Sequence, residues 1–478
     1  AALWADFNAG RPTARIPIIL GTNTRYFLFN DDANPGRLSF KDYSEDPDVM
    51  FDTQLKNQRW SKFNLLQDAE LGLPEKWSIG VDFQNYYEAG WFGCGLHYFD
   101  GQVPDTLPDF ADAPERLMEN GIPDPFGGLM ARGLEYWEHF KARAQNETFL
   151  DRPISVSVPF SGTDGPMTVA CNLFGAGFVC ETMADDPERL QTLLSFLTEA
   201  TIVRMITWRK AGGIPVPQKD FGIADDSVAL ISTAMYREHV LPHHRRLYEA
   251  LSEPGCPRGI HLCGDATRHF QTLVDELNVK NFDTGFPVDF QALRRDLGRD
   301  VRLQGGPHVD FLLRSTPEQV RAEVWRILNS GVLEGGRFLL REGNNLAPYT
   351  PLANTEAMYH AGREAERILA GEQVGAPAGR KVALDECPVE RFCARKPTFG
   401  AASSGQEEFR SRPLHKCRRI RSAAEDHIAV LCGFHQREQG LDAGGIEIQT
   451  RCQRLLKNRK PGFKNARDPA CGLHPCPP

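Results

Sequence analysis

The feature that most constrains this fold is an alternation of short apolar, β-prone runs with helical segments, extending from about residue 16 to residue 344. Several helical segments open on a capping residue followed by Pro and an acid, as in Asp186-Pro187-Glu188 and Thr316-Pro317-Glu318. Alternating strands and helices predict a parallel sheet, and eight units predict an α/β fold of the closed (β/α)₈, or TIM, barrel type. The eight expected strands are 16–20, 77–81, 154–158, 213–216, 259–263, 279–282, 301–303 and 337–340.

Two regions depart from this alternation. The long polar segment 84–150, in the N-terminal part, predicts an insertion over the mouth of a barrel that spans residues 1–371. Residues 372–478 keep no apolar period and are rich in Arg, Cys, Pro and Gly, which predicts an irregular tail without assigned function. Three interpretations of the tail stay open: a disordered segment, a stretch outside the native reading frame, or a zinc or disulfide module, although it lacks a C-x-x-C pair.

Charge and cysteine distribution restrict the function classes. Residues 372–478 contain 19 Lys and Arg against 12 Asp and Glu, so the rest of the chain carries a balance of −15. An acidic body argues against nucleic acid as a partner, and no apolar run approaches the roughly 18 residues of a membrane span. Five scattered cysteines in the first 371 residues are typical of reduced thiols. A cytoplasmic protein is expected, with its oligomeric state open.

The chemistry is expected at His261 and Cys263, which lie two positions apart in the fifth strand. Side chains at i and i+2 of a strand point to the same side, and active sites of these barrels lie at the C-terminal ends of the strands. Neutral imidazole and thiolate are natural zinc ligands. The pair therefore predicts a zinc site, with a buried His and Cys of purely structural role as the alternative.

A series of short motifs extends along the chain from about residue 10 to residue 371. The motifs are Gly165-Pro166-Met167-Thr168, Asp185-Asp186-Pro187-Glu188, Ala224-Asp225-Asp226, 235–242, His261-Leu262-Cys263-Gly264-Asp265, Pro287-Val288-Asp289, Leu297-Gly298, 303–306, 315–320 and 350–354. Their order resembles the uroporphyrinogen decarboxylase superfamily, which includes cobalamin-dependent thiol methyltransferases. The resemblance implies a TIM barrel and an enzyme acting on a small molecule, with a corrinoid as co-substrate and a corrinoid protein as partner in the methyltransferase branch.

The methyltransferase branch matches best, because its H-x-C supplies two zinc ligands. By that resemblance, zinc holds a thiol substrate as thiolate, and a methyl group moves between the thiol and a corrinoid. The branch has a third Cys ligand after strand eight, where this chain has Asn344. We expect a substitute, with Asp283 at the end of the sixth strand ranked before Glu342 and His308.

Uroporphyrinogen decarboxylation is the alternative, and a non-catalytic barrel that binds a corrinoid or tetrapyrrole is a third hypothesis. Arg25 and Tyr26 resemble the end of the decarboxylase arginine motif, whose first arginine and glutamine are missing here. Asp82 resembles the pyrrole-binding aspartate, and Asn344 falls near the family's His after strand eight. Arg25, Tyr26 and Asn344 are therefore candidate substrate-binding residues, and Asp82 is a candidate catalytic residue.

Further candidates rest on position alone. Asp225 and Asp226 follow the fourth strand, where a carboxylate acts as a general base, orients a ligand or is simply solvated. Tyr86 belongs to an aromatic cluster that would either wall a substrate pocket or pack an inserted segment. The pair His243-His244 is expected to face solvent.

Overall fold

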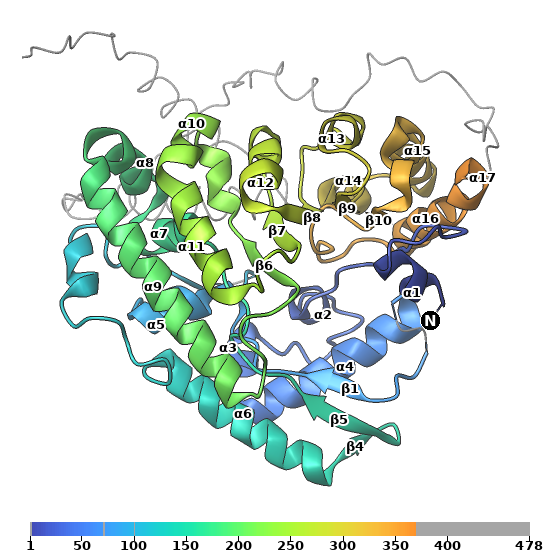
Figure 1. Ribbon diagram of the computed structural model, residues 1–478. Helices are drawn as coiled ribbons and strands as arrows, with labels where there is room; N and C mark the ends of the chain where they lie inside the picture. Colours follow the sequence, from blue (N-terminus) through green and yellow to red (C-terminus); the bar gives the residue numbers. More distant parts are fainter. Residues whose placement is uncertain (1, 70–71, 100, 370–478) are drawn as a thin grey trace, which may run out of the picture.

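The computed structural model describes residues 2–69, 72–99 and 101–369, and the predicted tail 372–478 lies outside them (Figure 1). The strands are β1 (Trp77–Ile79), β2 (Leu96–His97), β3 (Asp105–Thr106), β4 (Thr148–Phe149), β5 (Arg152–Val156), β6 (Phe221–Ala224), β7 (Arg258–Leu262), β8 (Val279–Thr284), β9 (Arg302–Gly305) and β10 (Phe338–Leu340). The helices are α1 (Ala2–Asn8), α2 (Thr24–Leu28), α3 (Phe40–Glu45), α4 (Pro47–Asn64), α5 (Tyr87–Phe92), α6 (Leu129–Asn146), α7 (Pro166–Phe174), α8 (Ala176–Asp185), α9 (Pro187–Ala211), α10 (Thr233–Met235), α11 (Leu241–Leu251), α12 (Phe270–Leu277), α13 (Phe290–Leu297), α14 (Val309–Arg314), α15 (Pro317–Ile327), α16 (Leu352–Arg363) and α17 (Ala365–Leu369).

The strands that follow residue 220 form one parallel sheet in the order β10-β9-β8-β7-β6. A second sheet pairs β1 with β5 in parallel, and β4 adds to β5 antiparallel. Single bridges extend this order at both ends of the larger sheet, because Ile18 pairs with Leu340 and Asp164 pairs with Ala224. Consecutive strands thus lie side by side, joined by helices, which is the arrangement of a TIM-barrel-like α/β fold.

Side chains cover the edges where a closed barrel would join its first two strands. Ile19 N–H donates to Leu340, so the alternate amides of Ile18 and Leu20 point away from β10, and they donate to the side chains of Asp68 and Gln67. On the β1 side, Gln54 of α4 bonds both the N–H and the C=O of Gly80. Amide and carboxylate side chains therefore satisfy the backbone at this junction, and closure into eight paired strands stays a prediction.

The fourth strand was predicted in the wrong place. Residues 213–216 form no strand, and the element that pairs with β7 is β6, five residues beyond. Pro215 and Pro217 lack the N–H that a central strand must donate on one of its edges, so the apolar pattern Gly-Ile-Pro-Val-Pro cannot enter the ladder. Gly212 instead ends α9, and the connection from there runs to Phe221.

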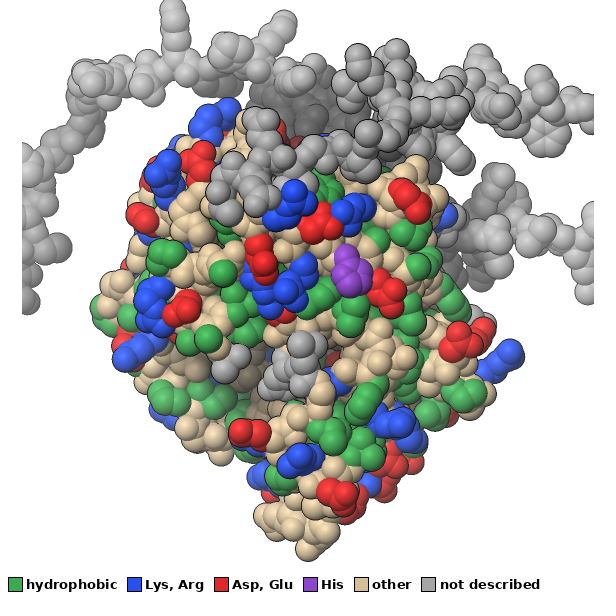
Figure 2. All heavy atoms as spheres, turned by 90° about the vertical axis from the view of Figure 1, so that its right-hand side faces the viewer, with side chains coloured by type: hydrophobic (Ala, Val, Ile, Leu, Met, Phe, Trp, Pro, Cys, Tyr) green, Lys and Arg blue, Asp and Glu red, His purple; other side chains and the backbone are tan. Residues whose placement is uncertain are grey.

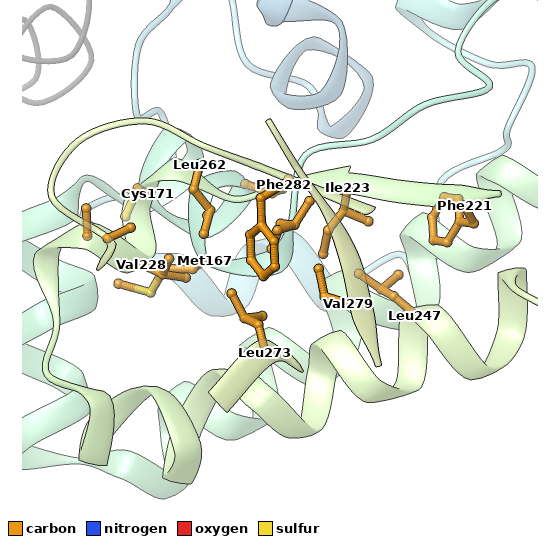
Figure 3. Close-up of a cluster of buried hydrophobic side chains, with 14 of the residues drawn as sticks. Met167, Cys171, Phe221, Ile223, Val228, Leu247, Leu262, Leu273, Val279 and Phe282 are labelled. Carbon is orange, nitrogen blue, oxygen red and sulfur yellow. The ribbon is translucent and has the colours of Figure 1, made fainter. Parts of the chain in front are cut away.

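The sheet is held against its outer helices by a continuous apolar core. In Figure 3, Ile223 of β6, Leu262 of β7 and Phe282 of β8 lie among side chains of the surrounding helices. Leu247 of α11 and Leu273 of α12 are buried on the helical side of this cluster. Burying a side chain of this size stabilises the fold by about 1.5–3 kcal/mol. The packing fixes β7, the strand that carries the expected site.

The insertion expected at 84–150 contains α5, the β2-β3 hairpin and α6. The predicted aromatic cluster consists of Tyr86, Tyr87, Trp91 and Phe92, and all but Tyr87 are buried, so most of it packs this segment. Among the described residues, no single helix has the length and apolar composition of a membrane span; α7 and α8 together do, but the chain turns by 110° between them. On the face in Figure 2, acidic and basic side chains are interspersed.

Candidate metal centre

His261 and Cys263 lie at the C-terminal end of β7 and point to the same side, as the strand period predicted. His261 Nε2 is 3.2 Å from Cys263 Sγ. Gly285, just after β8, permits this arrangement, because a Cβ there would come within 2.7 Å of the Cys263 Cα. Its N–H donates to Leu262 O at 2.8 Å, which locks the ends of the two strands together.

Asp226, two residues beyond β6, completes a group of three metal-binding side chains. Its Oδ1 accepts a hydrogen bond from Cys263 N at 2.7 Å and is 3.9 Å from His261 Nε2. One ligand atom from each of the three residues lies within 4.8 Å of the others. Zinc bonds of about 2.0–2.3 Å place tetrahedral donors about 3.5 Å apart, so this nitrogen, sulfur and oxygen set fits a zinc ion.

Asp283, which the sequence ranked first as the third ligand, meets the other nitrogen of the imidazole. It lies beside His261 in the β7-β8 register, and its Oδ2 is 3.0 Å from Nδ1. A carboxylate on Nδ1 holds the proton there and leaves the Nε2 lone pair for a metal. The geometry therefore favours Asp226 as the ligand and Asp283 as the group that orients His261.

Arg341, which sequence reasoning missed, connects this pair to the loop after β10. Its Nη1 donates to Asp283 at 2.9 Å, and its Nη2 donates to the backbone of Asn344 at 3.1 Å. Asn344 Nδ2 in turn lies 3.2 Å from Cys263 Sγ. The residue that replaces the expected cysteine is thus a neighbour of the thiol. Position was the available signal for Arg341, since it directly follows the eighth strand.

Glu342 and His308, the other two candidates for the third zinc ligand, make different contacts. Glu342 is buried, accepts from Gly21 N at 2.9 Å and pairs with Arg341 at 3.1 Å. Burial raises its pKa to about 7 against the opposing charge of Arg341. His308 accepts from Asp310 N at 2.9 Å and so caps α14, and burial lowers its pKa to about 4.

Charge is concentrated in the three-residue group and its orienting acid. Burial lowers the pKa of His261, but the charges of Cys263 and Asp226 and the bond to Asp283 outweigh it, leaving the pKa well above its ordinary value. Burial raises the pKa of Asp226, which the His261 charge partly offsets. The side chains of His261 and Asp226 remain 24% and 30% exposed, so a small molecule can reach them.

Asp225, the other acid of the Asp-Asp pair, faces inward. It is fully buried and accepts from Thr168 N, Thr168 Oγ1 and His244 Nε2, each at 2.7 Å. Thr168 lies at the start of α7, and His244 lies in α11 and also contacts Tyr236 Oη at 3.0 Å. The prediction that His243 and His244 face solvent is wrong, because both are buried in α11. The bonds to Thr168 and His244 give Asp225 a structural position.

Asp82 lies in a separate polar cavity of about 370 Å³. Its carboxylate accepts from Tyr43 Oη at 2.8 Å, Thr24 Oγ1 at 3.0 Å and Gln84. The cavity is lined by Thr22, Asn23, Thr24, Gln54, Asn57, Gln58, Gly80, Val81, Asp82 and Gln84.

The remaining substrate-binding candidates lie outside that lining. Arg25 and Tyr26 are buried in α2, and Tyr26 Oη donates to Thr350 O at 3.0 Å. Tyr86 is fully buried and stacks on Phe83. Their substrate-binding roles stay predictions.

Known proteins similar to this chain include both methyltransferases and decarboxylases. The family model for uroporphyrinogen decarboxylase (URO-D) matches residues 3–365. The chain is 30% identical over 326 residues to a methylated-thiol–coenzyme M methyltransferase of Methanosarcina mazei, covering 64% of this chain and 80% of that protein. It is 21% identical over 286 residues to the methylcobamide:CoM methyltransferase MtbA of Methanosarcina acetivorans, covering 59% of this chain and 78% of the relative.

A uroporphyrinogen decarboxylase of Rhodococcus erythropolis is 31% identical over 216 residues, which is 42% of this chain and 58% of that enzyme. Among solved structures, a methyltransferase from Methanosarcina mazei superposes with a TM-score of 0.52 at 20% identity. The superposition covers 76% of this chain and 97% of that one, and it supports the TIM-barrel-like fold.

Proposed function

The chain belongs to the uroporphyrinogen decarboxylase (URO-D) family, and on that premise we propose that it is a zinc-dependent methyltransferase that moves a methyl group between a corrinoid and a thiol or related small acceptor. The observation that carries the proposal is the group formed by Asp226, His261 and Cys263, whose ligand atoms lie within 4.8 Å of one another. A nitrogen, a sulfur and an oxygen donor leave a tetrahedral ion one position for a substrate.

The protein residues prepare this centre for a thiol. Asp283 orients the His261 ring through Nδ1 and Arg341 holds Asp283, so Nε2 faces the Sγ of Cys263, where a metal ion shared by the two would displace its proton. Asp226 accepts a hydrogen bond from Cys263 N, which connects the proposed ligand after β6 to the one at the end of β7. Gly285 keeps β8 against the Cys263 backbone. These contacts position the ligand side chains before any ligand arrives, as binding and catalysis require.

When bound, zinc would lower the pKa of a substrate thiol and hold it as thiolate. In that reaction the methyl group would pass from a methylated corrinoid to the thiolate sulfur, and cobalt would keep the electron pair of the cobalt–carbon bond. The thiol proton would leave to solvent past His261 and Asp226, whose side chains are partly exposed. A corrinoid carried on a separate protein is the partner that this reaction implies.

Decarboxylation receives less support from the residues near Asp82. A substrate rich in carboxylates needs several cations, whereas the 370 Å³ cavity is lined by uncharged side chains and one carboxylate. Asp82 also accepts from Thr24, Tyr43 and Gln84, which leaves little of its hydrogen-bonding capacity for pyrrole N–H groups.

The test is metal content together with thiol methylation. Reduced, purified protein should contain about one zinc per chain and should demethylate methylcobalamin in the presence of a small thiol, followed by visible absorbance. Cys263→Ala should lose both properties, and Cys256→Ala, a half-buried thiol outside the group, should keep both. Protein without zinc, or a Cys263→Ala variant that retains zinc, would overturn the proposal.

A further inference from the structure

We propose that Arg132, with the hydroxyls of Ser44, Tyr86 and Tyr98, forms a second binding site that takes a small oxyanion. The four residues come from α3, the segment after β1, the β2-β3 hairpin region and α6. Five of their polar atoms are buried and, among the described residues, have no hydrogen-bond partner: Ser44 Oγ, Tyr86 Oη, Tyr98 Oη, Arg132 Nε and Arg132 Nη2.

These atoms belong to one group. Burial raises the pKa values of Tyr86 and Tyr98, and the positive charge of Arg132 works against burial at both. Ser44 also lies close enough to lower both pKa values, although none of these approaches has good hydrogen-bond geometry. Contacts around Phe83 place the group in space: Arg132 lies over its ring, Tyr86 stacks on it, and Tyr136, which donates to Ser44 O, packs against it.

The guanidinium is already oriented for in-plane recognition. Arg132 Cζ lies 4.9 Å above the centre of the Phe83 ring, so the aromatic face stabilises the flat side of the cation. Its N–H groups lie in the guanidinium plane, and two of the nitrogens have no acceptor within the part of the chain that the structure describes. A buried donor without an acceptor is unfavourable, and more than nine in ten buried polar groups in native proteins are satisfied.

The chemistry of the group selects an anion. Guanidinium N–H groups are donors only, and each hydroxyl can donate. A carboxylate, sulfonate or phosphate has enough acceptor oxygens to take several of them at once and would neutralise Arg132. Tyr136 Oη donates to Ser44 O at 3.2 Å and closes one side of the group.

Three carboxylates act on the edge of this oxyanion site. The charge of Asp82 raises the pKa of Tyr86, but the oxygens of Asp82 already accept several hydrogen bonds. Glu45 raises the pKa of Tyr98 by its charge and as a nearby acceptor without good hydrogen-bond geometry, and Asp46 raises the pKa of Tyr136 by its charge. Both acids are exposed, where water screens their charge. Arg132 itself is partly exposed, which gives a small ion a route to the group.

The experiment measures binding of inorganic phosphate, ethanesulfonate and acetate by calorimetry and thermal unfolding, at constant ionic strength set with chloride. At least one of the three should bind saturably and raise the Tm of the wild-type protein. Arg132→Gln should abolish this binding. Lys56→Gln, which removes one exposed positive charge from α4, should leave it unchanged.

Tyr98→Phe keeps the partly exposed ring and removes one donor, so it should fold and bind the same anion about tenfold more weakly. Zinc content should stay the same in all variants, which separates this site from the proposed metal centre. If none of the three anions binds saturably, or if Arg132→Gln binds them as the wild type does, the site holds water and the proposal is wrong.

Discussion

Replacing Asp283 with Asn tests the division of labour at the metal centre. Asp283 Oδ2 is 3.0 Å from His261 Nδ1 and 2.9 Å from Arg341 Nη1. Asparagine has the same shape, and its oxygen can still accept from Nδ1, but the negative charge that makes the imidazole a better ligand is lost. Substitutions of such orienting groups weaken metal binding by about 10–100-fold, which corresponds to about 1.4–2.7 kcal/mol.

Removing one of the proposed zinc ligands should weaken zinc binding more than Asp283→Asn does. Asp226→Ala deletes one of three donors and leaves Cys263 N without its 2.7 Å acceptor, so zinc affinity should fall well beyond 100-fold. Zinc affinity would be measured at pH 7 by competition with a chromophoric chelator. Asp289→Asn is the matched control, because Asp289 caps α13 through Ala292 N and Asn caps helices equally well.

Which of the two variants loses more zinc affinity decides which acid is the third ligand. If Asp283→Asn weakens zinc binding as much as Asp226→Ala, Asp283 is the ligand, as the sequence first suggested. An unchanged affinity in Asp283→Asn would refute the reasoning that an anion on Nδ1 tunes the centre.

Three further predictions concern the surroundings of the site and the insertion. Burial raises the pKa of Asp105 to about 6 in the folded protein, above its usual value, so the folded state binds more protons and stability falls as pH rises from about 4 to about 6. Asp105→Asn should therefore raise the free energy of unfolding at pH 7.5 by about 2–3 kcal/mol, a gain that shrinks toward pH 4; urea unfolding at both pH values checks this, and a gain independent of pH would contradict it. Gly285→Ala places a Cβ 2.7 Å from the Cys263 Cα and should lower zinc affinity about tenfold or more, whereas Gly177→Ala, where a Cβ meets open space, should not; equal chelator competition for the two variants would disprove the close approach. Asp225→Ala leaves Thr168 and His244 without their buried acceptor and should destabilise the protein by about 3–5 kcal/mol, measured by urea unfolding; a loss under 1 kcal/mol would show that water replaces the carboxylate.

Local features of the sequence were sufficient for the helix starts and for the central pair of the site. Asp186 and Thr316 cap α9 and α15, which begin at Pro187 and Pro317 as the capping pattern predicted. His261 and Cys263 meet because a strand repeats every two residues, whatever surrounds it. These predictions held because the physical cause lies within a few residues of the chain.

Other decisions needed the packed fold. The apolar run at 213–216 resembled a strand, but its prolines excluded it from the ladder and β6 took its place. At the junction between residues 16–20 and β1, the side chains of Gln54, Gln67 and Asp68 satisfy the backbone, and no local pattern reveals these roles.

The choice of the third ligand is the clearest case. Asp226 follows β6 and Asp283 lies near the end of β8, the two strands that flank β7, so the sequence placed both near the same opening. Strand register sets Asp283 beside His261 and Asp226 beside Cys263, and the orientation of one imidazole ring then decides which acid meets Nδ1 and which shares the Nε2 side. Sequence alone determined which donor types gather at the ends of the strands. Only the tertiary structure decided their order, because register and ring rotation are set by contacts between segments far apart in the chain.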